Sequence, residues 1–258
     1  AFIHENLITH VVKLLYRLSL NKSKHVIFEN LDDLALFRQQ KLVSVAISER
    51  IAGPGVDTDH FKRKPAKHND PFIFLYIGRL LWDKGIGELV EASRMLRDKG
   101  ILVRVQLLGP AATNNKSSVG IDKVKAWENE EIVEYLGETD DVRPFIEHAD
   151  CIVLPSYREG LPGALLEACS MARPVIASNV PGCREIVEHG CGMLCTARSS
   201  TSLLSAMEEM IGLGREKRKV IGEQGRKIAQ ENYSLSVVNG RYLQIISNLV
   251  GEKCQRVK

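Results

Sequence analysis

The chain has 258 residues, of which 44% are hydrophobic and 26% are charged, a composition typical of a folded globular protein and not of a disordered one. Its formal net charge is only +3, which argues against the dense Lys/Arg surface of a nucleic-acid-binding protein. No apolar run reaches the ~20 residues that span a bilayer. The first residues lack the basic segment and apolar core of a signal peptide.

The cysteine pattern favours a reduced, cytoplasmic chain. The six cysteines include no CxxC pair, and the sequence has no disulfide framework. Cys191 and Cys195 lie near His189, but no second Cys/His pair at ligand spacing accompanies them. No metal site is therefore expected there.

The first 50 residues alternate helix and strand signals. A helix is predicted by apolar residues at helical spacing, namely Leu7, Val11, Leu14, Leu15 and Leu18. A short strand at residues 25–30, a helix at 31–40 and a strand at 42–47 follow, which is the order of a doubly wound sheet. Residues 51–70 are rich in Gly, Pro and charge without periodicity and predict an interdomain connection.

From residue 71 the alternation restarts. Short apolar runs predict strands at residues 71–78, 101–109, 131–137, 150–155, 173–178 and 191–195. Between them, helices are predicted at residues 85–99, 140–149 and 162–171, with one turn at 184–187. Buried strands separated by amphipathic helices indicate an α/β fold with a Rossmann-like, doubly wound parallel sheet covered on both faces.

The C-terminal part is predicted to be entirely helical. It carries two apolar stripes, formed by Leu203, Leu204, Met207 and Ile211, and by Leu235, Val238, Tyr242, Ile245 and Leu249.

Two loops that directly follow predicted strands are candidates for chemistry, because open parallel sheets bind ligands beyond the carboxyl ends of their strands. In the first, Gly78 lets the backbone approach a ligand, and Arg79 and Lys84 supply two cations near a helix start. This loop is a plausible diphosphate clamp. A surface turn with two solvated basic side chains is the alternative.

The second loop places Glu159 and Glu167 eight residues apart across a Gly-Leu-Pro turn into a helix. The N–H groups of Gly160 to Gly163 would point toward an anion at that helix start. Helix capping or a dipole partner is the ordinary alternative for these glutamates.

Together these segments resemble the donor domain of the family-four retaining glycosyltransferases, which have the GT-B fold. The resemblance rests on IGRLLWDKG and REGLPGALLEA, joined by LLGP and YLG and continued by RPVIASNVPGCREIV and CGMLC. GPGVDTDHF resembles the interdomain connection of that family. Residues 57–258 would be the nucleotide-sugar donor domain, and residues 1–56 the end of a truncated acceptor-side Rossmann-like domain with the connection.

The resemblance implies roles for individual residues. Arg79 and Lys84 would bind the donor diphosphate, and Glu159 would contact the transferred sugar. These three would be the catalytic residues. The remaining donor-binding residues would be Gly78, Gly137, Glu138, Gly160, Leu161, Pro162 and Glu167, with Glu167 on the ribose and the Gly137–Glu138 loop near the base. No cofactor and no metal are implied.

The implied reaction moves a sugar, expected from a UDP-sugar, to a lipid-linked or polysaccharide acceptor with retention of configuration. The residues up to Phe61 look most similar to bacterial capsule and O-antigen assembly enzymes. The chain would work in the cytoplasm, with possible peripheral contact at the inner membrane face, and would have no nucleic-acid partner.

Two features depart from the family pattern. Asp57-Thr58-Asp59 has the form of a DxD metal motif but lies in the connection, so we interpret it as a turn. The family's glycine-rich loop and catalytic histidine have no match, since His4, His10 and His25 lie in other contexts. This chain alone would therefore bind a donor without transferring it, and its last apolar stripe would be partly uncovered.

Two other functions remain open. A nucleotide-sugar epimerase shares the architecture and the diphosphate site. A non-catalytic subunit could instead supply the donor site to a separate acceptor-domain partner.

Overall fold

The computed structural model describes residues 7–65, 69–111 and 115–255. Its larger unit is built on a six-stranded parallel sheet. In chain order the strands are β3 (Phe72–Ile77), β4 (Val103–Leu108), β5 (Glu134–Tyr135), β6 (Cys151–Leu154), β7 (Val175–Ser178) and β8 (Gly192–Cys195). The spatial order is β5-β4-β3-β6-β7-β8. The chain moves outward from β3, then returns to its other side at β6, which is the doubly wound arrangement predicted.

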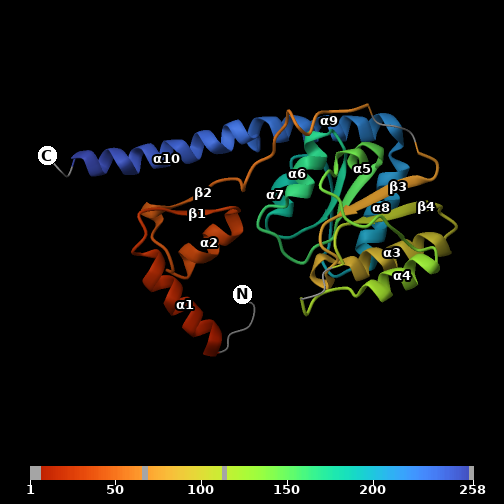
Figure 1. The fold of residues 1–258 in the computed structure, drawn as a ribbon, viewed down its shortest axis with the longest axis horizontal. Coiled ribbons are helices and arrows are strands. Elements are labelled where there is room, and N and C mark those ends of the chain that lie inside the picture. The colour runs from red at the N-terminus through yellow and green to blue at the C-terminus, as the bar shows by residue number, and fades with distance from the viewer. Residues whose placement is uncertain (1–6, 66–68, 112–114, 256–258) are drawn as a thin grey trace.

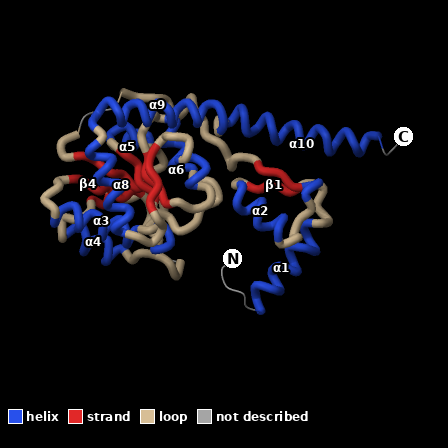
Figure 2. Tube along the Cα trace, turned by 180° about the vertical axis from the view of Figure 1, so that it is seen from behind, coloured by secondary structure: helices blue, strands red, loops and turns tan. Residues whose placement is uncertain are grey.

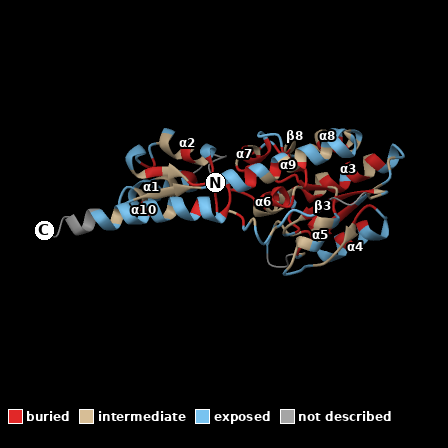
Figure 3. Cartoon of the chain, turned by 90° about the horizontal axis from the view of Figure 1, so that it is seen from above, coloured by how far each residue is buried: buried red, intermediate tan, exposed pale blue. Residues whose placement is uncertain are grey.

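Helices cover both faces of this sheet (Figures 1 and 2). One face carries α3 (Ile86–Asp98), α4 (Ile121–Asn129) and α8 (Ser200–Gly212), and α3 packs on α8. The other face carries α5 (Arg143–His148), α6 (Gly163–Ser170), α7 (Cys183–Val187) and α9 (Gly214–Asn232), and α6 packs on α9. Every residue of β6 and β7 is buried (Figure 3). Their continuous apolar runs follow from this two-sided burial.

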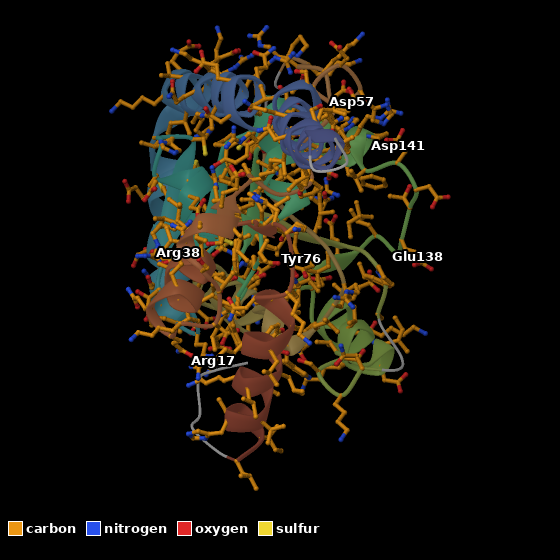
Figure 4. The ribbon with its side chains drawn as sticks, turned by 90° about the vertical axis from the view of Figure 1, so that its left-hand side faces the viewer. Arg17, Arg38, Asp57, Tyr76, Glu138 and Asp141 are labelled. Carbon is orange, nitrogen blue, oxygen red and sulfur yellow. The ribbon has the colours of Figure 1, made fainter. Side chains whose placement is uncertain are left out.

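A smaller unit contains α1 (Leu7–Leu20), β1 (Val26–Phe28), α2 (Leu31–Gln39) and β2 (Ser48–Arg50). β1 and β2 form a parallel pair. Arg17 on α1 donates hydrogen bonds to the carbonyls of Gln40 and Lys41, and Arg38 on α2 donates to Ser48 (Figure 4). Arg17 thus joins α1 to the turn after α2, and Arg38 joins α2 to the first residue of β2.

The last helix, α10 (Leu235–Gln255), leaves the larger unit and runs along the smaller one (Figure 1). Its predicted stripe packs there, since Val238 and Ile245 form a buried cluster with Ile51, and Tyr242 and Leu249 join its edge. Only Leu235 of that stripe is exposed, at 37%. The expectation of a partly uncovered stripe is confirmed at Leu235, while Ile27 of β1 and Ile51 after β2 cover Val238 and Ile245.

The strand predicted at residues 42–47 is wrong. Leu42 and Val43 are buried in a non-strand segment, and the next residues form a 3₁₀ turn, η1 (Val45–Ile47). The Ser44 hydroxyl accepts a hydrogen bond from the N–H of Ala46, which favours the turn. The pairing with β1 therefore begins at Ser48.

Other predicted elements exist with shorter bounds. Only Glu134 and Tyr135 of the strand predicted at 131–137 pair with β4. The helix predicted at 140–149 begins at Arg143, because Asp141 accepts a hydrogen bond from the Arg143 N–H and holds a turn before it. Helix α4 was not predicted, although Val124 and Trp127 are its buried residues at helical spacing.

The predicted connection contains no helix or strand in its described residues. Asp57 accepts hydrogen bonds from the N–H groups of Asp59 and His60, which confirms the turn predicted for this motif. These bonds are the main cause of a lowered Asp57 pKa. His4 lies outside the described residues. No helix in the described part of the chain has the length and apolar character needed to cross a bilayer.

The buried guanidinium of Arg173 yields a stability prediction. Arg173 is 1% exposed and donates hydrogen bonds to the carbonyls of Lys64, Ile146, Glu147 and Met171. Replacing it by methionine removes all four hydrogen bonds, of which those to Ile146 and Met171 are buried. Arg173→Met is expected to lower the free energy of unfolding by about 2–4 kcal/mol in urea titration.

Arg104→Met is the matched control. Arg104 forms an exposed bidentate pair with Glu134 at 2.6 and 2.7 Å. Its loss is expected to change stability by less than about 1 kcal/mol. Equal effects of the two substitutions would contradict the structural role given to Arg173.

Candidate functional site

A cleft of about 450 Å³ lies at the carboxyl ends of β3 and β6, where the strand order reverses. Open α/β sheets bind ligands at this position, and the volume suits a small organic ligand. The predicted site residues that line the cleft are Gly78, Arg79, Lys84, Glu159, Pro162 and Glu167. The structure therefore brings together residues that lie almost ninety positions apart.

The loop after β3 is held by close backbone packing. Gly78 has φ +151°, and its carbonyl lies so close to Gly109 that a side chain at Gly109 would collide with it. The hydroxyl of Tyr76 donates a hydrogen bond of 2.8 Å to the Arg79 carbonyl. Burial raises the pKa of Tyr76 far above its usual range, so the phenol stays a neutral donor. The loop conformation is thus defined before any ligand arrives.

Gly85 allows the two loops to meet. It has φ +74°, and a β-carbon there would collide with the Pro155 carbonyl after β6. The close approach places Lys84, at the end of the 3₁₀ turn η2 (Trp82–Lys84), next to Glu159. Only glycine combines this backbone conformation with this contact.

The charges in the cleft are only partly paired. The Lys84 ammonium contacts both oxygens of Glu159, at 2.6 and 2.8 Å, and the two side chains are 23% and 12% exposed. Arg79 is exposed, and its side chain makes no hydrogen bond or ion pair with the described residues. One cation therefore holds a carboxylate in place, while the other is available for an anion.

Glu167 lies in α6, and its carboxylate is turned toward the start of the same helix. A β-carbon on Gly163 would lie 3.9 Å from Glu167 Oε1. Burial raises the pKa of Glu167 above its ordinary value, because no cation offsets the loss of water around the carboxylate. Gly163 and Ala164 also line the cleft, and the first N–H groups of a helix lack partners within it. The surface near them suits an anion.

The other predicted site residues do not line the cleft. The Gly137 carbonyl accepts a 2.7 Å hydrogen bond from the Gly109 N–H, and Glu138 is exposed on the loop after β5 (Figure 4). The carbonyl of Gly160 accepts a hydrogen bond from Asn30 in the smaller unit. The buried side chain of Leu161 packs against Gly53. Gly160 and Leu161 thus belong to the loop after β6, which forms one wall of the cleft. Gly137 supports the opposite wall, the loop after β3, through Gly109.

One end of the cleft is lined by residues that were not among the predicted site residues. His60, Phe61, Asp140, Asp141 and Val142 line it. Figure 4 shows Asp141 on the same segment as Glu138, which follows β5.

A small polar network fixes this end. Arg143 binds Asp141 through two contacts of 2.7 Å, and it also lies 3.4 Å from His60 Nδ1. The hydrogen bonds from Arg143 lower the pKa of Asp141 to about 2. The sequence contained one signal for this end of the cleft, since His60 and Phe61 end the segment GPGVDTDHF that resembles the family's connection. Their position beside the segment after β5 arises only in the tertiary structure.

No three His, Cys, Asp or Glu side chains in the described ranges converge in a way that could hold a metal ion. Cys191, near which a metal was considered, is buried and its thiol donates to the Ile186 carbonyl.

Comparison with known proteins places this geometry in a family. Residues 57–228 match the family model described as glycosyl transferases group 1. An α-1,3-N-acetylgalactosaminyltransferase of Campylobacter jejuni that acts on N,N'-diacetylbacillosaminyl-diphospho-undecaprenol is 28% identical over 95% of this chain and 66% of its own length. The capsular polysaccharide biosynthesis glycosyltransferase CapM of Staphylococcus aureus is 28% identical over 66% of this chain and 44% of its own.

Solved structures agree on the fold. Sucrose-phosphate synthase from Thermosynechococcus elongatus superposes with a TM-score of 0.80 at 20% identity, over 94% of this chain and 62% of that one. The HepE protein of Anabaena, solved in complex with UDP, gives a TM-score of 0.80 at 21% identity, over 96% and 70%. This chain thus spans about two thirds or less of the length of the two relatives above. The matched residues include both loops of the cleft, and the chain belongs to the group 1 glycosyltransferases with the GT-B fold.

Proposed function

We propose that the cleft binds a nucleotide-sugar and that the protein transfers its sugar to a growing cell-surface glycan. The observation that carries this proposal is that an unpaired Arg79 and the Lys84–Glu159 pair line one cleft, at the place where the strand order of the sheet reverses. Cations there suit a diphosphate, and carboxylates suit hydroxyl groups. The HepE structures with UDP and with UDP-glucose support a UDP-sugar as the donor class.

In the proposed binding mode each group has a separate task. Arg79 and Lys84 hold the diphosphate, and the first turn of α6 contributes its N–H groups. Glu159, oriented by Lys84, accepts hydrogen bonds from the sugar. Glu167 accepts them from the ribose. The base occupies the end near His60 and Asp141, next to the loop that carries Gly137 and Glu138.

This arrangement suits a reaction in which the leaving group gains charge. As the glycosidic bond breaks, negative charge grows on the departing diphosphate, and fixed cations stabilise it without reorganisation. We propose retention of configuration by attack from the face of the leaving group, whose phosphate oxygen accepts the acceptor's proton. Since Arg79 and Lys84 perform the charge stabilisation, no metal is assigned a role.

The proposed acceptor is a lipid-linked or polysaccharide glycan in capsule or O-antigen assembly at the cytoplasmic face of the membrane. The names of the two relatives support this class, since one acts on a diphospho-undecaprenol-linked sugar and the other works in capsular polysaccharide biosynthesis. In our proposal this chain supplies the donor side of the reaction.

Calorimetric titration with UDP, GDP and ADP tests the donor site. One nucleotide, expected to be UDP, should bind. Arg79→Ala should weaken its binding by about 10- to 100-fold, because a charge-assisted hydrogen bond of ~1.5–3 kcal/mol is lost. Glu167→Ala should also weaken it.

Arg104→Ala serves as the control, since Arg104 lies near the amino end of β4, away from the cleft. Binding that survives Arg79→Ala unchanged would refute the proposed diphosphate site.

The raised pKa of Glu167 gives a second test. The carboxylate form accepts hydrogen bonds from ribose, so UDP affinity should fall as pH decreases through this raised pKa. The phosphate of UDP titrates too, so the informative quantity is the difference between wild type and Glu167→Gln. That difference in affinity should be largest at neutral pH and disappear in acid.

For stability, the substitution Glu167→Gln is expected to have the opposite effect from the one it has on UDP binding. Because the pKa is higher in the folded than in the unfolded chain, ionisation of Glu167 destabilises the ligand-free fold, and this loss develops as pH rises from the unfolded to the folded pKa. Glu167→Gln should therefore stabilise the ligand-free protein at neutral pH while it weakens UDP binding. A variant that loses both stability and binding would show that Glu167 is a structural residue.

A further inference from the structure

A buried carboxylate outside the cleft, Glu185 on α7, joins the two units of the molecule. Its residue is 7% exposed. One carboxylate oxygen pairs with Arg50 at 2.7 Å, and the other accepts a 2.5 Å hydrogen bond from the N–H of Leu31. Arg50 belongs to β2 and Leu31 begins α2, so both partners come from the smaller unit.

Tyr233 contacts both Glu185 and its partner Arg50. The Arg50 guanidinium lies 5.9 Å from the centre of the Tyr233 ring, and the Tyr233 hydroxyl donates to the Glu185 backbone carbonyl. Tyr233 lies directly between α9 and α10. Glu185 therefore lies where α7, the smaller unit and the start of the returning helix meet.

The start of α2 also contacts the loop that carries Glu159. Asn30 caps α2 by accepting a hydrogen bond from the Asp33 N–H, while its amide group donates a 3.0 Å hydrogen bond to the Gly160 carbonyl. Asp33 pairs with Arg158 on the other side of Glu159. Two groups of α2 thus hold the residues that flank Glu159 on either side.

The start of helix α7 also packs against this loop. Gly182, just before α7, has φ +79°, and a β-carbon there would collide with the Gly160 carbonyl and lie 3.1 Å from the Glu159 carbonyl. Glu185 ties this helix to α2 within one turn of that contact. The loop is therefore held between α7 and α2, which are joined by Glu185 and by a 3.9 Å pair of Arg184 with Asp32.

We propose that Glu185 is a positioning residue for the donor cleft: by holding α2 against α7, it keeps Glu159 in place beside Lys84. The effect on donor binding rests on the proposed function, whereas the effect of Glu185 on the position of the Glu159 loop does not. A buried ion pair is weak as a source of net stability, yet removing one partner disturbs its surroundings strongly. Donor binding would then depend on the contact between the two units.

The first measurement needs no ligand. In ¹H–¹⁵N spectra, Glu185→Ala should shift or broaden the backbone amide resonances of Gly160 and Leu161. Asn30→Asp should do the same, because it keeps the α2 cap but removes the donor to Gly160. Arg104→Met, which breaks an exposed arginine–carboxylate pair elsewhere, should leave these resonances unchanged. If Glu185→Ala does not fold, Glu185→Gln replaces it.

The second measurement compares UDP-glucose with UDP. Since Glu159 is assigned to the sugar, Glu185→Ala should weaken UDP-glucose binding about tenfold and change UDP binding much less. Glu159→Gln should remove most of that difference, and Glu185→Ala should add little to Glu159→Gln, because both act on the same contact.

The outcomes separate the two proposals. Unchanged Gly160 and Leu161 resonances in a folded Glu185 variant, or equal losses of UDP and UDP-glucose affinity, would overturn the role given to Glu185. A wild-type chain that binds neither ligand would refute the proposed donor site, and the spectra would still decide whether Glu185 holds the loop.

Discussion

The parallel pairing of β3 with β6 is the constraint on which the rest of the structure depends. The strands meet in the register Phe74 to Cys151 and Leu75 to Ile152, so their carboxyl ends open at the same edge of the sheet. Each is followed by a loop that carries charge, and Gly85 lets these loops touch at Pro155. The Lys84–Glu159 pair is a consequence of this pairing, because neither loop would hold its side chain at that place alone.

The cleft contains charged groups without protein partners in the part of the chain that the structure describes, which is typical of a binding site. Lys84 and Glu159 neutralise each other, but Arg79 has no partner in the described residues and Glu167 has a pKa raised by burial. An unpaired, partly buried carboxylate lowers stability at neutral pH, and such groups gather where ligands supply the missing partners. The nucleotide that we propose would offer both partners at once, with phosphates for Arg79 and ribose hydroxyls for Glu167.

The two walls of the cleft are held by different parts of the molecule. The wall after β3 is fixed within the larger unit by Tyr76 and Gly109. The wall after β6 is also held from outside the larger unit's sheet and helices, through Asn30 of the smaller unit and Gly53 of the connection. Helix α10 returns along β1 and β2 and keeps that unit in place. A motion between the units would therefore displace the loop that carries Glu159. In this way the contact between the units would affect the proposed sugar-binding position.

The sequence by itself determined the fold class, most strands and the two loops of the site, because buried parallel strands leave continuous apolar runs and because Gly78, Arg79, Glu159 and Glu167 follow two of those runs closely. It did not determine the strand at Ser48–Arg50 or helix α4, whose signals are weaker than the local turn and packing effects. Only the tertiary structure decided that His60 and Asp141 line one end of the cleft, and that Gly160 meets Asn30 of the smaller unit and Leu161 meets Gly53 of the connection. These contacts join segments far apart in the chain, and no local pattern records which distant backbone group a side chain will meet.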